Sequence, residues 1–178
     1  MRLERTAFLF SRSELEALLE LTDSPRLPFY PGVPSDLEEG LASLERASLA
    51  QRAGEQVLLD RVTAFLAGSV GHSESCVCMV GDGVYYGIFF REAVSVLLEL
   101  RESMWLLTPF PDAEEATRAF EESLPWPEGA VFLGLRVGQT ALLRPCEPDA
   151  VRAAALDAVA RAQTMRPLTE EEQLQWKP

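Results

Sequence analysis

His72 is the single histidine of this 178-residue chain, so a Ser–His or Cys–His catalytic pair would need it. It lies in Gly71-His72-Ser73-Glu74, a polar stretch that we predict to be part of an exposed linker. General acid–base catalysis requires an imidazole whose tautomer and orientation are fixed by its neighbours, and a linker provides neither. We therefore expect no catalytic residue in this chain.

Cys76 and Cys78 follow closely and are the next side chains that could do chemistry. Two positions apart on a strand, they point to the same face, whereas zinc sites usually place two or more residues between cysteines on a knuckle turn. Free cysteines commonly act as small core residues. With Cys146 they make an odd number without disulfide spacing, which fits a reducing compartment. We expect no metal, although His72, Cys76 and Cys78 leave such a site open.

Other catalytic patterns are weak. Gly81-x-Gly83 lacks the helix or the lysine that follows a phosphate-binding glycine loop, so it is explained as a turn. Adjacent acids on a helix splay about a hundred degrees apart and form no acid–base dyad. The pairs concerned are Glu38-Glu39, Glu114-Glu115 and Glu121-Glu122. Because Lys177 is the one lysine, Schiff-base chemistry is disfavoured as well, and we expect neither a cofactor nor an enzyme.

Composition favours one folded domain that binds protein. Hydrophobic residues make up 47% of the chain, enough for a sizeable core. The net charge of −12 repels nucleic acid and anionic membranes and leaves basic or apolar protein surfaces as better partners. The N-terminus has no apolar signal region, and no run approaches the roughly eighteen apolar residues of a membrane span. We expect a cytoplasmic protein with a protein partner, and a homodimer is left open.

The elements that would position these residues centre on a β-meander from Ser75 to Pro109. Apolar and alternating runs predict four strands, at 75–80, 84–90, 94–101 and 104–108. Gly81-Asp82-Gly83 suits the first hairpin turn, and the prolines at 109 and 111 would end the last strand. The meander predicts a sheet with one face built for a core.

The part before the meander, residues 1–68, is predicted to be mainly helical after a short strand at 6–10. Ser11 with Glu14 and Ser35 with Glu38 have capping-box spacing and start two helices. A third helix is expected from about Val57 to Ala67, and residues 47–57 form either a turn or a small hairpin. Two short helices, a connector and a third helix resemble half of a winged-helix module. Residues 68–74 would be a linker.

After the meander we expect a helix at 112–123, strands at 131–137 and 140–143, a helix at 148–165, and a tail at 167–178. Thr169 with Glu172 predicts another capping box in that tail. The whole chain, 1–178, is thus interpreted as a single α+β domain whose sheet part, 75–145, carries one helix.

Aromatic residues outside the predicted core are the candidates for binding a partner. Phe29 and Tyr30 lie in a connector between Pro25 and Pro34, and Trp126 lies between two prolines. Trp126 and, near the end of the chain, Trp176 are either exposed anchors of an interface or packed against the domain's own edge, whereas Trp105 belongs to the sheet core.

Four features follow one another along the chain and form a pattern. They are the opening Phe8-Leu-Phe-Ser11-x-x-Glu14-Leu-x-x-Leu18-Leu19, the proline-containing link, the helices up to the meander, and Trp105-Leu-Leu-x-Pro109 before an acidic helix. The pattern resembles that of the EspG-type chaperones of ESX (type VII) secretion systems, over about residues 6 to 145. The resemblance implies an α+β protein that holds a secretion substrate in the cytosol and catalyses nothing. From the third helix onward the order of elements, the small size and the low pI are also similar to type III secretion chaperones.

The leading hypothesis is a non-enzymatic cytoplasmic protein-binding module, a secretion-associated chaperone that holds a partner protein. An acidic immunity or antitoxin-like inhibitor of a basic toxin is the alternative, because it would use the same negative charge. An enzyme is the least favoured interpretation.

Overall fold

The structure, a computed structural model, describes residues 6–24, 26–32, 35–81 and 83–176. Its elements are β1 (Phe8–Ser11), α1 (Arg12–Leu21), α2 (Leu37–Arg46), β2 (Ala50–Ala53), β3 (Gln56–Leu59), α3 (Arg61–Gly71), β4 (Ser75–Gly81), β5 (Val84–Arg91), β6 (Val94–Arg101), β7 (Met104–Phe110), α4 (Ala113–Ser123), β8 (Val131–Val137), β9 (Thr140–Cys146), α5 (Val151–Ala162) and α6 (Glu170–Gln175). They confirm the predicted α+β class. Pro25, Pro34, Asp82, Lys177 and the first five residues, which entered the predictions, lie outside the described residues.

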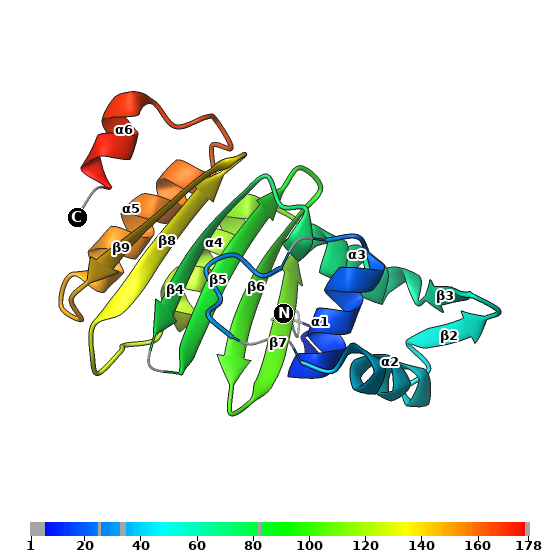
Figure 1. Ribbon diagram of the computed structural model, residues 1–178. Coiled ribbons are helices and arrows are strands. Elements are labelled where there is room, and N and C mark those ends of the chain that lie inside the picture. Colours follow the sequence, from blue (N-terminus) through cyan, green and yellow to red (C-terminus); the bar gives the residue numbers. More distant parts are fainter. Residues whose placement is uncertain (1–5, 25, 33–34, 82, 177–178) are drawn as a thin grey trace, which may run out of the picture.

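Seven of the strands form one antiparallel sheet in the order β1-β7-β6-β5-β4-β8-β9 (Figure 1). The predicted meander is confirmed, because β4 to β7 are neighbours in sequence order. β7 extends to Phe110, past Pro109, at which the sequence predicts its end. β1 pairs with β7 and β8 pairs with β4, so the N-terminal strand and the β8–β9 hairpin flank the meander on opposite sides.

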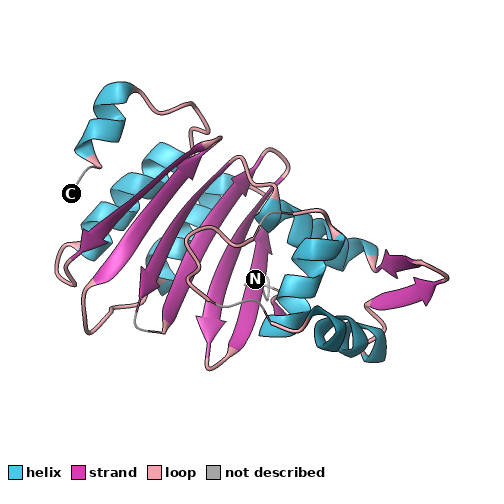
Figure 2. Ribbon diagram, viewed as in Figure 1, coloured by secondary structure: helices cyan, strands magenta, loops and turns pink. Residues whose placement is uncertain are grey.

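Helices cover the two faces of this sheet unequally (Figures 1 and 2). We call the face that carries α1, α2 and α3 the front face, and the face that carries α4 and α5 the back face. On the back, α4 packs on β5 to β7, and α5 packs on β4 and β8. The front helices contact β5, β6 and β7, and within the described chain no residue of β8 or β9 belongs to the front core. The β8–β9 hairpin therefore has a helical layer on its back face alone.

The start of α1 follows the sequence prediction, and that of α2 does not. Ser11 accepts a hydrogen bond from the Glu14 N–H, and the Glu14 carboxylate accepts one from the Ser11 N–H, which confirms this capping box. α2 is capped by Asp36, so the predicted Ser35 cap is wrong. Ser35 instead donates from its N–H and hydroxyl to the Glu16 carboxylate on α1. A hydrogen bond to an ionised carboxylate is charge-assisted, so the Ser35 hydroxyl serves as a donor to Glu16. The N–H groups at the start of α2 donate to Asp36 instead.

Residues 50–59 form a hairpin, β2–β3, which projects beyond the helical layer (Figure 1). The helix predicted from Val57 begins only at Arg61, so its first four residues were assigned wrongly. Asp60 ends the hairpin and caps α3 by accepting hydrogen bonds from the N–H and the hydroxyl of Thr63. Gly54, with φ 67°, allows the tight turn between the strands.

The predicted linker at 68–74 is wrong in its first half, since α3 continues to Gly71 and buries residues 68–71. Gly71, within this segment, permits close packing instead of flexibility. A Cβ at Gly71 would lie 3.2 Å from the Cα of Ser24, so no larger residue fits there. Composition alone does not distinguish a glycine of a linker from a glycine at a close helix contact.

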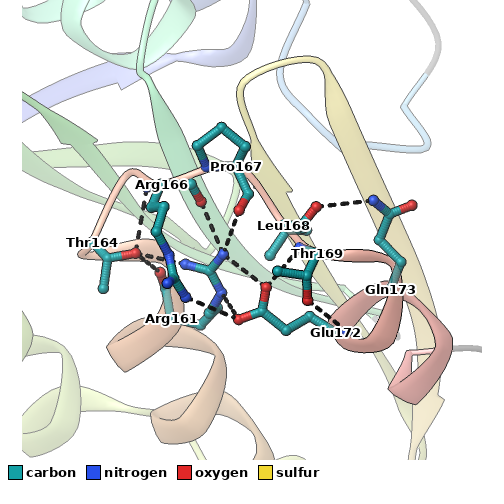
Figure 3. Close-up of polar contacts among 8 residues, drawn as sticks. All are labelled: Arg161, Thr164, Arg166, Pro167, Leu168, Thr169, Glu172 and Gln173. Atoms are coloured by element: carbon teal, nitrogen blue, oxygen red, sulfur yellow. Dashed lines mark hydrogen bonds and ion pairs between the residues drawn. The ribbon is translucent and has the colours of Figure 1, made fainter.

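The C-terminal tail folds back onto the sheet through α6, whose predicted Thr169–Glu172 capping box is confirmed. Arg161, in the last turn of α5, holds Glu172 through two contacts, Nε to Oε1 at 2.5 Å and Nη2 to Oε2 at 3.0 Å (Figure 3). Its Nη2 also donates to the carbonyls of Arg166 and Pro167. We call this set of contacts the C-terminal latch.

Candidate protein-binding surface

The residues that could have formed a catalytic site each have a structural role in the fold. His72 ends α3 and donates from Nε2 to the Thr22 carbonyl at 3.1 Å, so it is fixed in place instead of lying in a flexible linker. Cys76 and Cys78 are buried in the front core. Cys78 Sγ lies 3.3 Å from Tyr85 Oη, and burial raises the pKa of both groups well above their usual values, so both are neutral at pH 7.

Phe29 and Tyr30 lie in the connector between α1 and α2, which crosses the front face of the sheet (Figure 1). Both are half-buried and pack on the front core. Tyr30 meets Trp105 edge to face, with ring centroids 5.2 Å apart, and the Arg12 guanidinium lies 5.6 Å from its ring centre. Phe29 lies on Gly134 of β8. Their partner-binding role stays a prediction, and both also have clear packing roles.

The alternatives for the two tryptophans have different outcomes. Trp126 is 70% exposed and has the Arg152 guanidinium 5.5 Å from its ring centre. Trp176 is only 8% exposed, because α6 brings it against Arg144, whose guanidinium lies 4.5 Å from the ring centre. Of the two alternatives for Trp176, packing against the domain's own edge is therefore confirmed, and the exposed anchor is not.

The front face of the β8–β9 hairpin carries apolar side chains that no helix of the described chain covers. The register pairs Phe132 with Pro145 and Arg136 with Ala141, on the same face as Val80 and Cys76 of β4. Phe132 is 49% and Leu143 46% exposed, and Ala141 and Pro145 are exposed beside them. We call these four residues the hairpin face. Because the opposite faces of the same strands are packed against α5 and the tail, the strands are held firmly while this face stays open.

The free edge of β9 is less suited to binding than its face. Pro145 has no N–H to donate to an added strand. Natural sheets use proline in edge strands to discourage edge-to-edge pairing. At the other side of the sheet, β1 is only four residues long. A partner is therefore expected to pack its side chains on the hairpin face and not to add a strand to the edge of β9.

A hollow of about 210 Å³ borders this face, between the connector and the turn after β4. Tyr30, Val80 and Leu100 line it, and Val80 is the cross-strand partner of Phe132. Apolar side chains and glycine backbone make up most of its wall, so it suits an apolar side chain of a partner.

Acidic residues lie at one end of the hairpin face. Glu128 precedes β8, and Glu147 and Asp149 follow β9, at the end where Phe132 and Pro145 pair. All three are exposed. In a chain with net charge −12, they give this apolar face a negative border.

A second group of exposed apolar residues lies on the β2–β3 hairpin and the adjoining helix. Leu58 is 55%, Val62 52% and Phe65 49% exposed. Val62 and Phe65 are three residues apart on α3 and share one helical face. This group provides an independent comparison for any test of the hairpin face.

Sequence reasoning predicted the buried side of β8 and did not find the exposed side. The strand predicted at 131–137 is confirmed, and its alternate residues Val131, Leu133, Leu135 and Val137 form part of the back core. The missed signal is that Phe132 interrupts the alternation and Leu143 is apolar on the same face. A strand with apolar residues on both faces is expected to be buried on both faces. In this chain α5 and the tail bury the back face of β8 and β9, and Phe132 and Leu143 on the front face stay exposed.

The sequence matches no family model and no curated protein. Among solved structures, one that resembles the fold contains the Mycobacterium tuberculosis type VII secretion system chaperone EspG5 in complex with the PE25–PPE41 dimer. The match has 9% sequence identity and a TM-score of 0.49, and it covers 94% of this chain and 99% of the other. Similarity at this level does not establish a shared function.

In the described part of the chain, no helix has the length and apolar character that crossing a membrane requires. In the same residues, no three side chains of histidine, cysteine, aspartate or glutamate group as metal ligands would.

Proposed function

We propose that this protein is a non-enzymatic cytoplasmic binding module, a secretion-associated chaperone that holds a partner protein on its hairpin face. The observation that carries the proposal is the exposure of Phe132 and Leu143 on strands whose back face is firmly packed. Folded proteins usually bury such a surface or use it for contact with a partner. Covering it during the partner's stay in the cytosol would protect apolar surface on both molecules.

The mechanism is burial of apolar side chains with an acidic border that selects the partner. The hollow beside Tyr30 would receive an apolar side chain, and Glu128 and Glu147 would face basic groups of the partner. Opposite charges at the border speed encounter and reject acidic competitors, while the apolar centre sets the lifetime of the complex.

The experiment is a pull-down from native lysate, at moderate and at high salt, with the wild type and with the double variant Phe132→Asp, Leu143→Asp. We expect the wild type to retain one secreted or aggregation-prone protein at high salt and the double variant to lose it. The matched control is Leu58→Asp with Leu174→Asp, which adds the same two charges at residues that are 55% and 59% exposed. Equal retention by the wild type and the double variant would refute the proposal.

The acidic-inhibitor alternative is supported by the net charge of −12 and predicts another outcome. A basic toxin held by charge would be released at high salt, because exposed charge pairs are screened there. It would also be released by Glu128→Gln with Glu147→Gln, two changes that leave the apolar centre intact.

A further inference from the structure

Phe29 fills a gap in the front face that a glycine creates. If Gly134 carried a Cβ, that atom would lie 2.6 Å from Cε2 and 2.7 Å from Cγ of the Phe29 ring. The ring thus lies directly on the strand backbone, which only glycine permits at this contact distance. We call the space above Gly134 the aromatic subsite.

The aromatic subsite continues the hairpin face. Gly134 lies between Phe132 and Arg136 along β8, and Leu143 is its partner on β9. On its other side, Gly134 pairs with the buried Cys78 of β4. A partner lying on Phe132 and Leu143 would therefore reach the edge of the Phe29 ring.

The connector that carries Phe29 is held by few bonds. Among the described residues 26–32, the one backbone–backbone hydrogen bond joins the Tyr30 N–H to the Leu27 carbonyl at a long 3.4 Å. One further anchor is the Tyr85 hydroxyl, which donates to the Pro28 carbonyl at 3.0 Å. Segments with so few backbone bonds lie at the low-stability end of a protein and open first.

The backbone of Phe29 is also strained. Its φ is 60°, in the left-handed region that large side chains rarely adopt. Such a conformation persists where surrounding contacts impose it, and here the contact is the ring on Gly134.

We propose that Phe29 is a displaceable occupant of the aromatic subsite, and that the partner's docking segment replaces it with an aromatic side chain flanked by basic residues. The proposal rests on the function proposed above. The aromatic character follows from the ring that the chain itself places there. The basic neighbours follow from Glu128, Glu147 and Asp149, which are exposed just outside the ends of β8 and β9 where Phe132 pairs with Pro145. The charged residue within the face, Arg136, lies on the other side of Gly134 from Phe132.

If the partner displaces Phe29, the Phe29 ring competes with the partner's aromatic side chain for the aromatic subsite and makes no favourable contact with the partner. A binding-competent state populated at about 0.1–10% weakens the apparent affinity by that fraction. Removing the ring should therefore tighten binding by about tenfold or more. A direct contact residue behaves in the opposite way, because its removal weakens binding.

The test uses two peptides, acetyl-Gly-Arg-Trp-Arg-Gly-amide and the same peptide with alanine in place of tryptophan, followed by the backbone amide signals of Gly134 and Leu143. The full chain is used as wild type, Phe29→Ala and Gly134→Ala. Phe29→Gly serves as a second opening variant, because glycine adopts φ 60° without steric cost and keeps the connector path. Gly134→Ala fills the subsite, so it displaces the ring and also blocks the ligand.

We expect the tryptophan peptide, but not the alanine peptide, to shift both signals. The Kd should fall about tenfold or more in Phe29→Ala and Phe29→Gly, and binding should be lost in Gly134→Ala. An unchanged or weaker affinity in both opening variants would overturn the proposal, as would full binding by Gly134→Ala. The proposed function is tested separately, because loss of the protein partner on Phe132→Asp with Leu143→Asp does not depend on Phe29.

Discussion

Phe132 and Leu133 are neighbours on β8 whose side chains have opposite surroundings. Phe132 lies 49% exposed on the front face, and Leu133 is fully buried in the back core. Leu133→Ala should lower the free energy of unfolding by about 2–5 kcal/mol, because it removes buried methyl groups and leaves a cavity. Phe132→Ala should change it by about 0.5 kcal/mol or less. Urea unfolding of both variants checks this.

The effects on partner affinity should be the reverse of the effects on stability at Phe132 and Leu133. Phe132→Ala weakens binding because it shortens the apolar contact, while Leu133→Ala leaves the affinity unchanged under conditions where the variant remains folded. A stability loss at Phe132 as large as that at Leu133 would show that the front face is covered.

At this scale the sequence could identify aromatic candidates but not their surroundings. Phe29, Tyr30, Trp126 and Trp176 have similar sequence settings, beside prolines or near a chain end. Only the fold shows that α6 buries Trp176 while Trp126 stays 70% exposed. The difference arises from contacts between residues distant in sequence, such as Trp176 with Arg144, which no local pattern encodes.

At the scale of elements, the C-terminal latch makes the position of α6 depend on pH. The hydrogen bond from the Thr169 N–H, together with Arg161, lowers the pKa of Glu172 to about 2. Since this is below the ordinary value of 4.5, the latch stabilises the folded tail above about pH 4.5 and is lost as the pH falls toward 2. We expect the indole N–H signal of Trp176 to move toward its unfolded position over that range.

Replacing the carboxylate should loosen the tail without acid. Glu172→Gln is expected to speed hydrogen exchange in residues 166–176 at neutral pH, because the neutral amide bonds Arg161 more weakly. Glu114→Gln is the matched control, since Glu114 forms an exposed pair with Arg118 on α4, far from the latch in sequence. Slow exchange in Glu172→Gln would mean that Trp176 and Leu168 alone hold α6.

The elements with regular hydrophobic period were predicted well, and the misassigned ones share a physical cause. The meander, β8 and the helix after it show clear periods of two or 3.6 residues. β3 is only Gln56–Leu59, too short for periodicity to distinguish it from the start of the following helix. The helix end at Gly68 to Gly71 was not predicted because glycine in composition indicates a linker, although Gly71 serves close packing against Ser24.

At the scale of the whole molecule, the net charge of −12 should govern how fast the partner arrives. Raising the salt concentration from about 0.05 to about 0.5 M shortens the Debye length several-fold, so we expect the association rate to fall by about tenfold. The dissociation rate should change little, because apolar contacts on the hairpin face set it. Stopped-flow mixing with the captured partner measures both rates.

Two changes at the border should reproduce part of this effect at low salt. Glu128→Gln with Glu147→Gln removes two charges beside Phe132 and should slow association without changing dissociation. A salt effect confined to dissociation would contradict the account, because the charges would then lie within the contact instead of around it.

The layered arrangement explains why the sequence predicted the fold class more completely than the binding surface. The α+β class follows from local periods, but which face of each strand receives a helix depends on how the connections cross the sheet. The connector between α1 and α2 covers the middle of the front face and reaches β8 only through the Phe29 ring on Gly134. The remaining front face of β8 and β9 stays exposed at Phe132 and Leu143. That boundary is set by one aromatic residue against one glycine, 105 positions apart in sequence.

The most direct test of the central claim is site-specific photo-cross-linking in cells, with p-benzoylphenylalanine introduced at position 143. The same residue at positions 65 and 174 provides the comparisons, because Phe65 and Leu174 are also exposed. We expect one dominant cross-linked protein from position 143 and little or none of it from the other two. Cross-linking of that protein from position 65 or 174 but not from 143 would place the binding surface elsewhere and refute binding on the hairpin face.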